Sequence, residues 1–509
     1  MRKLTKILIM TFLLVIALSS VSSLTSQAAS KGKYFLSGEL YYHTISNTKV
    51  EVCGTTRNEG TLTIPGYVYY KGKQYTVTQI ADHEIYYQNE TDTTDGNYMD
   101  LNMPACKNYD YYRTDGKQYP LDLKHISFCM IKKVILPSTL TYIGEGAFGG
   151  CYKLESVVFA SNYKKLTIGK NAFDGTSLKS IRFPNGTYEL KDCAAGTVAE
   201  IYIPASVKKI GAGVVNYKTK KVTIDKKNKK FKMKDGILYS YNGKTLIGAS
   251  AKVKKNVKVP KAVTKIGKMA FAGTNVKTVT LTNKIKTIPK GAFYKCKKLT
   301  SVKNTENVRE IEYGAFARCY KLKDIGALPN LAEIERAAFW NDSKLTLHLS
   351  KNVATIDDYA FCGYAYSYGA KVTVEENHPI FSIQDAFLVR TTTTDKTIIL
   401  SMKEAEQIII PEGITSVVCY VGGENCKEII LPSTLNKLYG NLETKEGRVV
   451  FKGTQPPIFR DKYRMRGVKS IVVPKGTYDI YKKTIGESYD DDYGDYYIWD
   501  DEDIELIEE

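Results

Sequence analysis

The sequence is poor in the residues that build most catalytic centres. It holds five histidines among 509 residues, and none forms an HExxH pair or stands beside a GxSxG nucleophile turn. No phosphate-binding loop, CxxC pair or His/Cys cluster with metal-ligand spacing is present, and the DDDYGD run lacks EF-hand spacing. We therefore predict a protein that is not an enzyme and that uses no cofactor or metal.

Long apolar runs are scarce as well. The one clear run, residues 7–18, follows a basic start and precedes a Ser/Thr-rich segment with Ser26 and Ala28 in the minus-three and minus-one positions. It falls short of the roughly 18 residues that a spanning helix needs, so the pattern predicts a signal peptide over residues 1–28. No LPxTG-like sorting signal is visible. We expect a secreted or cell-surface, extracellular protein without a transmembrane segment.

Arginine is rare beside lysine, with 12 against 61 residues, and the formal net charge is +19. The last 23 residues hold 12 acidic and no basic side chains, so residues 1–486 carry +31, or about +28 without the signal peptide. Such a field attracts anionic glycans, wall polymers or acidic patches on proteins, although a solvated surface without a ligand explains it equally well. Nucleic acid is not expected, because bidentate phosphate and base contacts favour arginine. The densest patch is Lys226, Lys227, Lys229 and Lys230.

What the chain has in abundance is an internal repeat. Strings such as EGAFGGCYKL, KGAFYKCKKL and YGAFARCYKL share an Ala-Phe pair, and the four steps from Phe271 to Phe361 are 22, 23, 23 and 22 residues long. Between the pairs runs a short alternating segment that often ends in proline, as in VILP, IYIP and IVVP, which predicts a strand. One such unit cannot bury its own apolar face, so the units must stack as coils with Phe over Phe.

The repeat also bears on the ten cysteines. Cys151, Cys296 and Cys319 stand three residues after the Ala-Phe phenylalanine, where other copies have Thr176 and Thr274. A slot that accepts Cys or Thr favours a small buried side chain over a disulfide. Disulfide pairing stays open for the cysteines outside this slot, which are Cys53, Cys106, Cys129, Cys193, Cys419 and Cys426.

On these strings the chain resembles the BspA-type, or treponemal-type, leucine-rich repeat proteins. The resemblance implies a right-handed α/β repeat solenoid with a parallel β-sheet on its concave face and short helices or turns outside. It also implies a bacterial surface or secreted protein that binds host matrix or plasma proteins. Residues 29–80 resemble the usual first module of that family, and residues 446–486 resemble its closing module, with repeats expected over residues 132–445.

Three segments depart from the repeat. The polar residues 81–131 form a Tyr-rich insertion, either a recognition loop or an inert excursion, in which we single out Tyr109, Tyr111 and Tyr112 as contacts. Residues 231–249 carry an Asn-Gly pair between strand-like runs and residues 380–401 repeat that layout, which predicts two β-hairpin insertions. The acidic residues 487–509 form a solvated tail, a weak cation site or a counter-charge to the basic body.

These observations predict a monomeric binding protein whose ligand lies along the strand face. Period-2 alternation directs every second strand residue to solvent. The primary hypothesis is an adhesin for host matrix or plasma proteins, and the alternative is a binder of anionic glycans or cell-wall polymers. The candidate ligand-facing strand residues are Arg182, Tyr202, Thr280, Lys303 and His348.

Overall fold

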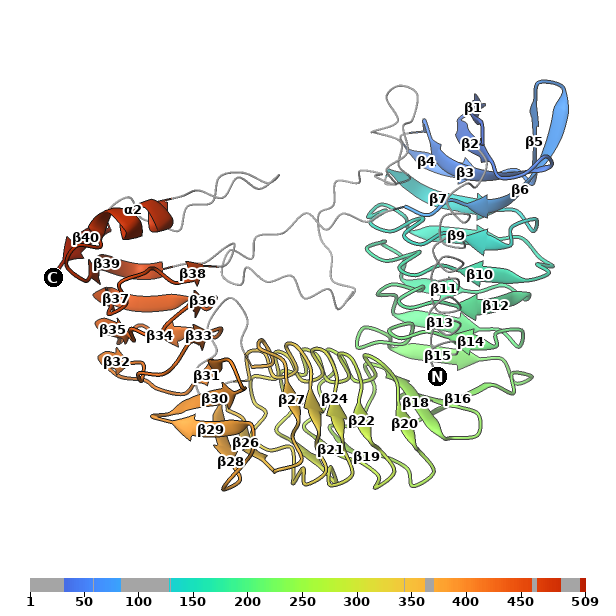
Figure 1. The fold of residues 1–509 in the computed structure, drawn as a ribbon. Coiled ribbons are helices and arrows are strands. Elements are labelled where there is room, and N and C mark those ends of the chain that lie inside the picture. Colours follow the sequence, from blue (N-terminus) through green and yellow to red (C-terminus); the bar gives the residue numbers. More distant parts are fainter. Residues whose placement is uncertain are drawn as a thin grey trace, which may run out of the picture.

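The computed structural model describes residues 32–57, 59–83, 128, 130–342, 344–361, 370–459, 465–486 and 504–509. These residues form a β-solenoid of about 15 turns. Figure 1 shows three stacks of coils joined at two corners into an open U. The described part of the chain has one α-helix, so of the short helices or turns predicted outside the sheet, the described coils use turns. Outside these residues lie the predicted signal peptide, Tyr109, Tyr111, Tyr112, Cys106, Cys129 and most of the acidic segment.

Most coils contribute two short strands, one to each of two parallel ladders. The first ladder is built from the alternating segments that the sequence predicts as strands, of which only some end in proline. Its strands are β7 (Ile131–Leu136), β9 (Ser156–Phe159), β11 (Ser180–Arg182), β13 (Glu200–Ile203), β15 (Lys221–Ile224), β19 (Asn256–Lys258), β21 (Thr278–Thr280), β23 (Ser301–Lys303), β26 (Thr346–Leu349), β28 (Lys371–Val374), β32 (Gln407–Ile409) and β35 (Glu428–Leu431). It ends in β37 (Leu442–Phe451) and β39 (Met465–Val473).

The second ladder uses strands of only two to four residues just before each Ala-Phe segment, which the sequence pattern does not predict. These strands are β8 (Tyr142–Ile143), β10 (Leu166–Ile168), β12 (Thr187–Leu190), β14 (Lys209–Ile210), β20 (Lys265–Ile266), β22 (Thr287–Ile288), β24 (Glu310–Ile311), β25 (Glu333–Ile334), β27 (Thr355–Ile356), β33 (Ser416–Val417), β36 (Lys437–Leu438) and β38 (Ile458–Phe459). A further short strand, β34 (Val421–Gly422), pairs with β37.

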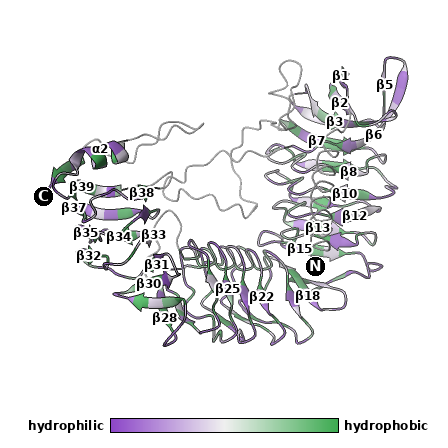
Figure 2. Ribbon diagram, in the orientation of Figure 1, coloured by the Kyte–Doolittle hydropathy of each residue, from purple (hydrophilic) through white to green (hydrophobic). Residues whose placement is uncertain are grey.

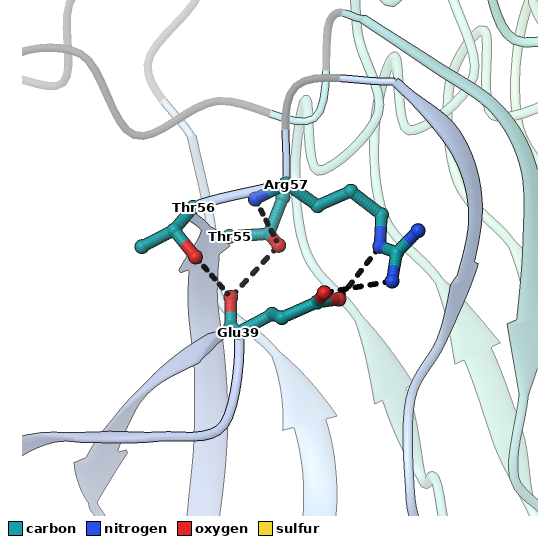
Figure 3. Close-up of polar contacts among 4 residues, drawn as sticks. All are labelled: Glu39, Thr55, Thr56 and Arg57. Atoms are coloured by element: carbon teal, nitrogen blue, oxygen red, sulfur yellow. Dashed lines mark hydrogen bonds and ion pairs between the residues drawn. The ribbon is translucent and has the colours of Figure 1, made fainter.

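The N-terminal module covers the first coil. Its strands are β1 (Tyr34–Ser37), β2 (Leu40–Thr44), β3 (Lys49–Thr55), β4 (Gly60–Thr63), β5 (Tyr67–Tyr70) and β6 (Lys73–Ile80). Arg57 donates from Nε and Nη2 to the two carboxylate oxygens of Glu39, at 2.6 and 2.7 Å, while the Thr55 hydroxyl donates to the Glu39 carbonyl at 2.8 Å (Figure 3). This bidentate contact holds the end of β3 against the β1–β2 turn.

Each corner of the U contains three antiparallel strands, the last of which pairs in parallel with a strand of the second ladder. At the first corner they are β16 (Phe231–Lys234), β17 (Ile237–Ser240) and β18 (Thr245–Ala249), and at the second they are β29 (Phe381–Gln384), β30 (Phe387–Thr391) and β31 (Lys396–Ser401). In β17, Leu238 packs into the core of the first stack, whereas Ile237 and Tyr239 pack into the core of the rest. The hairpins therefore stand between stacks with both faces covered.

The phenylalanine spine predicted from the repeat is present. Successive rings of Phe271, Phe293, Phe316, Phe339 and Phe361 lie 5.2, 5.2, 5.5 and 5.6 Å apart, with interplanar angles of 14° or less. The Ala-Phe segments themselves form a further hydrogen-bonded column, since each Phe N–H donates to the Ala carbonyl of the next coil, as from Phe293 to Ala315 at 2.7 Å. Equivalent side chains are therefore stacked in register throughout the middle of the U.

The cysteine slot lies beside this spine. Cys296 and Cys319 are fully buried free thiols, and each Sγ donates to the carbonyl of a phenylalanine in the preceding coil, at 2.9 Å to Phe271 and 3.0 Å to Phe293. Thr274 also donates to the Phe271 carbonyl, at 2.7 Å, but Phe271 belongs to its own coil. The buried-thiol prediction is thus confirmed for these two cysteines. The remaining described cysteines are buried as well: Cys53, Cys151, Cys193, Cys419 and Cys426.

The C-terminal end is closed by a helix and a last strand. Helix α2 (Tyr478–Gly486) buries Tyr481 and Ile485 in the core. Residues 504–509 of the acidic segment include β40 (Glu505–Glu508), which pairs in parallel with β39. The Glu508 carboxylate accepts hydrogen bonds from the N–H groups of Thr477 and Tyr478, at the start of α2. This part of the acidic segment is an ordered cap, a role that none of the three interpretations foresaw.

Candidate binding surface

The five predicted strand residues face outward from the first ladder but do not form one cluster. Arg182, Lys303 and His348 are exposed, and Tyr202 and Thr280 are half-buried. Arg182 and Tyr202 are opposite each other on β11 and β13, while Thr280 and Lys303 are opposite each other on β21 and β23. His348 lies on a separate two-stranded sheet, where its Nδ1 is 3.0 Å from the Thr373 hydroxyl.

The first pair leads directly to the predicted basic patch. The Arg182 guanidinium lies 3.6 Å from the centre of the Tyr202 ring, and the Tyr202 hydroxyl donates to Asp225 at 2.8 Å. Asp225 accepts a second hydrogen bond from the Lys227 N–H at 2.8 Å. The Lys227 N–H, and after it the Tyr202 hydroxyl, lower the pKa of Asp225, because both donate to its charged form. This chain of contacts joins the strand face to the loop after β15.

We call residues 225–230, between β15 and β16, the lysine loop. Its four lysines are exposed, while Asn228 at its centre is buried. The Asn228 amide donates to the carbonyls of Pro204 and Val207 at 2.9 and 3.2 Å, and its Oδ1 accepts the N–H of Lys230 at 2.8 Å. Buried hydrogen bonds therefore fix the loop backbone, so the four ammonium groups project from a rigid support.

The second corner supplies an internal comparison for this loop. There His378 takes the place of Asn228, and its Nδ1 accepts the N–H groups of Ile380 and Phe381, both at 3.1 Å. The turns that follow also match: Asp235–Lys254 and Asp385–Lys403 are equivalent ion pairs. Yet lysines at 226, 227, 229, 230, 232 and 234 correspond to Glu376, Asn377, Pro379, Ile380, Ser382 and Gln384. The corner fold thus does not require the lysines.

The charge of the first corner is largely uncompensated. Residues 218–258 contain 14 lysines and two aspartates. Within the described ranges no carboxylate forms an ion pair with Lys226, Lys227, Lys229 or Lys230; the Lys229 ammonium instead lies 5.8 Å from the centre of the Tyr241 ring. Like charges held this close repel one another, so an anion at this surface relieves repulsion as well as forming new contacts. Sequence reasoning found these lysines but missed the Asn228 support.

The comparisons with known proteins agree with the repeat analysis. The model of the BspA type leucine rich repeat region matches in six copies, over residues 124–239 and 250–366. These residues of the chain consist of BspA-type leucine-rich repeats. The first matched segment covers the first stack and the start of the first corner, and the second covers the middle stack. No curated protein matches the sequence of this repeat protein.

Several solved structures are similar to this BspA-type protein. A leucine rich cell surface protein from Faecalibacterium prausnitzii is 19% identical, with 69% of this chain and 97% of that one covered and a TM-score of 0.41. The pneumococcal vaccine antigen PcpA is 16% identical, with 94% and 99% covered and a TM-score of 0.37. A leucine-rich repeat protein from Eubacterium ventriosum is 20% identical, with 68% and 97% covered and a TM-score of 0.39.

Two further observations concern the part of the BspA-type chain that the structure describes. No helix there is both long and apolar enough to cross a membrane. No group of three or more His, Cys, Asp or Glu side chains there is arranged to hold a metal ion.

Proposed function

We propose that this protein is a non-catalytic bacterial surface or secreted protein that captures anionic macromolecules at the lysine loop. The comparison of the two corners carries this proposal: the same hairpin fold, with the same turn and ion pair, has six lysines at one corner and none at the equivalent positions of the other. Because folding does not require the lysines, a binding role accounts for them. The BspA-type repeats support a binding protein rather than an enzyme.

Two partner classes fit the proposal, a sulfated or phosphate-bearing polymer and a host matrix or plasma protein with an acidic face. The polymer fits the geometry better, since the lysines follow one another along a loop and two strands instead of surrounding a pocket. Exposed lysines interact with anions mainly through their charge, and salt screens that attraction over about 8 Å at physiological ionic strength. Capture of the polymer is therefore expected to be salt-sensitive.

A charge variant tests the proposal. Lys226, Lys227, Lys229 and Lys230 are changed together to Gln, and retention on a heparin column is measured. With roughly 0.3–1 kcal/mol per exposed lysine, the affinity is expected to fall by about 8-fold to several-hundredfold. The matched control changes four exposed lysines of the middle stack to Gln, which removes the same charge elsewhere: Lys284, Lys286, Lys297 and Lys298. Equal losses in both variants would refute a specific site.

The Arg182 and Tyr202 pair provides a second test at the same site. Replacing both with Ala removes the hydroxyl that donates to Asp225 and is expected to weaken heparin retention by a few fold. Thr280, Lys303 and His348 replaced with Ala serve as the comparison, because they lie on other sheets. Pull-down from plasma and matrix fractions at two ionic strengths then separates the partner classes: a protein retained at high salt favours the adhesin.

A further inference from the structure

The hairpin of β5 and β6 displays two tyrosines that lie largely outside the core. Tyr67 and Tyr69 are 54% and 66% exposed, among the most exposed large apolar side chains of the described chain. They lie two residues apart on β5, so their rings point to the same side of the strand, about 7 Å from each other. Figure 1 places this hairpin at the end of the first stack that is opposite the lysine loop.

The back of the hairpin is fixed. Val68, between the two tyrosines, is 6% exposed. The Tyr70 ring stacks on the Phe35 ring of β1, with centres 4.1 Å apart and planes inclined by 12°. The hairpin is therefore anchored through one face, while Tyr67 and Tyr69 occupy the other face with few contacts of their own. Large rigid aromatic rings held in this way offer contact area at a low entropic cost.

Polar groups complete the exposed face. Gln74 donates its amide to the Tyr69 hydroxyl at 3.0 Å. Thr76 is opposite Tyr67 on one side and Lys49 of β3 on the other, so all three side chains share the face. No carboxylate among the described residues forms an ion pair with Lys49. The face thus combines two phenol rings, an amide, a hydroxyl and an ammonium group, and Figure 2 shows the hydrophilic colouring of this hairpin.

From this arrangement we propose that the face formed by Lys49, Tyr67, Tyr69, Gln74 and Thr76 binds a polysaccharide that carries carboxylate groups. A pyranose ring has an apolar C–H face and a rim of hydroxyls, so one side stacks on an aromatic ring while the rim exchanges hydrogen bonds with amide and hydroxyl groups. Tyr67 and Tyr69 supply the stacking surfaces. Gln74 and Thr76 form the hydrogen bonds, and the positive charge of Lys49 selects a uronate. The site extends the proposed function to a second location and does not depend on the lysine loop.

Hyaluronan, a polymer of uronate and amino sugar without sulfate, is the probe, and binding to the purified full chain is measured by affinity electrophoresis in 0.5 M NaCl. Stacking is not screened by salt, so binding is expected to persist where lysine-loop binding is lost. The double variant Y67A/Y69A is expected to bind at least tenfold more weakly. The variant Y67F/Y69F, which keeps both rings, is expected to stay within about threefold of the original chain.

Three comparisons make the test decisive. Tyr152→Ala removes another exposed tyrosine, 49% exposed, and is expected to leave hyaluronan binding unchanged. The lysine-loop variant is also expected to leave it unchanged in 0.5 M NaCl, which separates this proposal from the proposed function. Equal binding of neutral dextran in 0.1 M NaCl, where the charge of Lys49 is much less screened, would overturn the role of Lys49. A loss in Y67A/Y69A no larger than in Tyr152→Ala, with both variants folded by circular dichroism, would overturn the whole site.

Discussion

At the scale of single residues, buried polar groups determine where the solenoid is sensitive to its surroundings. Asp174 is 4% exposed, and its Oδ1 has no hydrogen-bond partner among the described residues. Burial raises the pKa of Asp174 to about 6, a shift only partly offset by a hydrogen bond from the Gly175 N–H. Asp174 therefore keeps its proton to a higher pH in the folded protein than in the unfolded chain.

Asp174 gives a pH-dependent prediction. Because its pKa is higher in the folded chain, its stabilising contribution is complete below the unfolded pKa near 4 and is lost as the pH rises through about 6. A pKa difference of about 2 corresponds to roughly 3 kcal/mol. Asp174→Asn is expected to raise the free energy of unfolding by up to that amount at pH 8 and hardly at all at pH 4. Urea denaturation at both pH values is the measurement, and an equal gain at both would contradict the pKa.

Backbone conformation imposes a second constraint on single residues. The position directly before most Ala-Phe pairs has a positive φ, as in Gly291 and Gly314 at 60°, and Ala337 adopts it at 56°. Side chains are unfavourable in this conformation, by about 1 kcal/mol. Ala337→Gly is expected to raise the melting temperature, and Gly314→Ala is expected to lower it. Shifts of the same sign in calorimetry would show that packing, not backbone conformation, dominates at this position.

At the scale of the element, each coil contributes one phenylalanine ring to the spine. Removal of that ring therefore takes a packing contact from both neighbouring coils. The Phe316 ring lies between those of Phe293 and Phe339 and is 1% exposed. Phe316→Ala is expected to destabilise the chain by roughly 3–5 kcal/mol through the cavity it leaves, and Phe316→Leu by clearly less. Chemical denaturation measures both. A loss below 1 kcal/mol in Phe316→Ala would mean that the rings do not support one another.

The elements also show why sequence reasoning succeeded in part. The spine could be predicted because a fixed repeat length places equal side chains above one another, and Asn242-Gly243 marked a hairpin turn. The second ladder could not be predicted, since strands as short as Tyr142–Ile143 show no periodicity. The left-handed position that glycine occupies in other coils could not be recognised where another residue adopts it, as at Asn171, Cys193, Met269 and Ala337. Strand β40 could not be predicted, because it lies in an acidic segment and forms only through long-range pairing with β39.

At the scale of the whole molecule, the two corners share the same hairpin fold but differ in their charge. Both hairpins fill the space where the stacks change direction (Figure 1), yet only the first has the lysines. The bend itself could not be predicted from the sequence, because periodicity within a coil carries no information about the angle between stacks. The candidate site was therefore predicted as a charged segment, while its rigid position at a corner emerged only from the structure.

This difference between the corners predicts a gain of function. Lysines placed at 376, 377, 379, 380, 382 and 384, with His378 retained, should give the second corner a copy of the lysine loop and of β16. The variant is expected to bind about twice as many short heparin oligosaccharides per chain in titration calorimetry, with a loss of stability mainly from Ile380, which packs against the core. Six lysines placed on exposed turns of the middle stack are the control. An unchanged stoichiometry would show that charge at a corner is insufficient for binding.

The partition made by strand β17 has a consequence for how the molecule comes apart. Adjacent residues on this strand are buried in different halves, Leu238 toward the N-terminal core and Ile237 and Tyr239 toward the other. Unfolding of either half would expose one face of β17 to solvent and leave the other face buried. The amide protons of residues 237–239 should therefore exchange with deuterium only after the less stable half has unfolded. Their exchange rates would measure how strongly the unfolding of one half is coupled to that of the other.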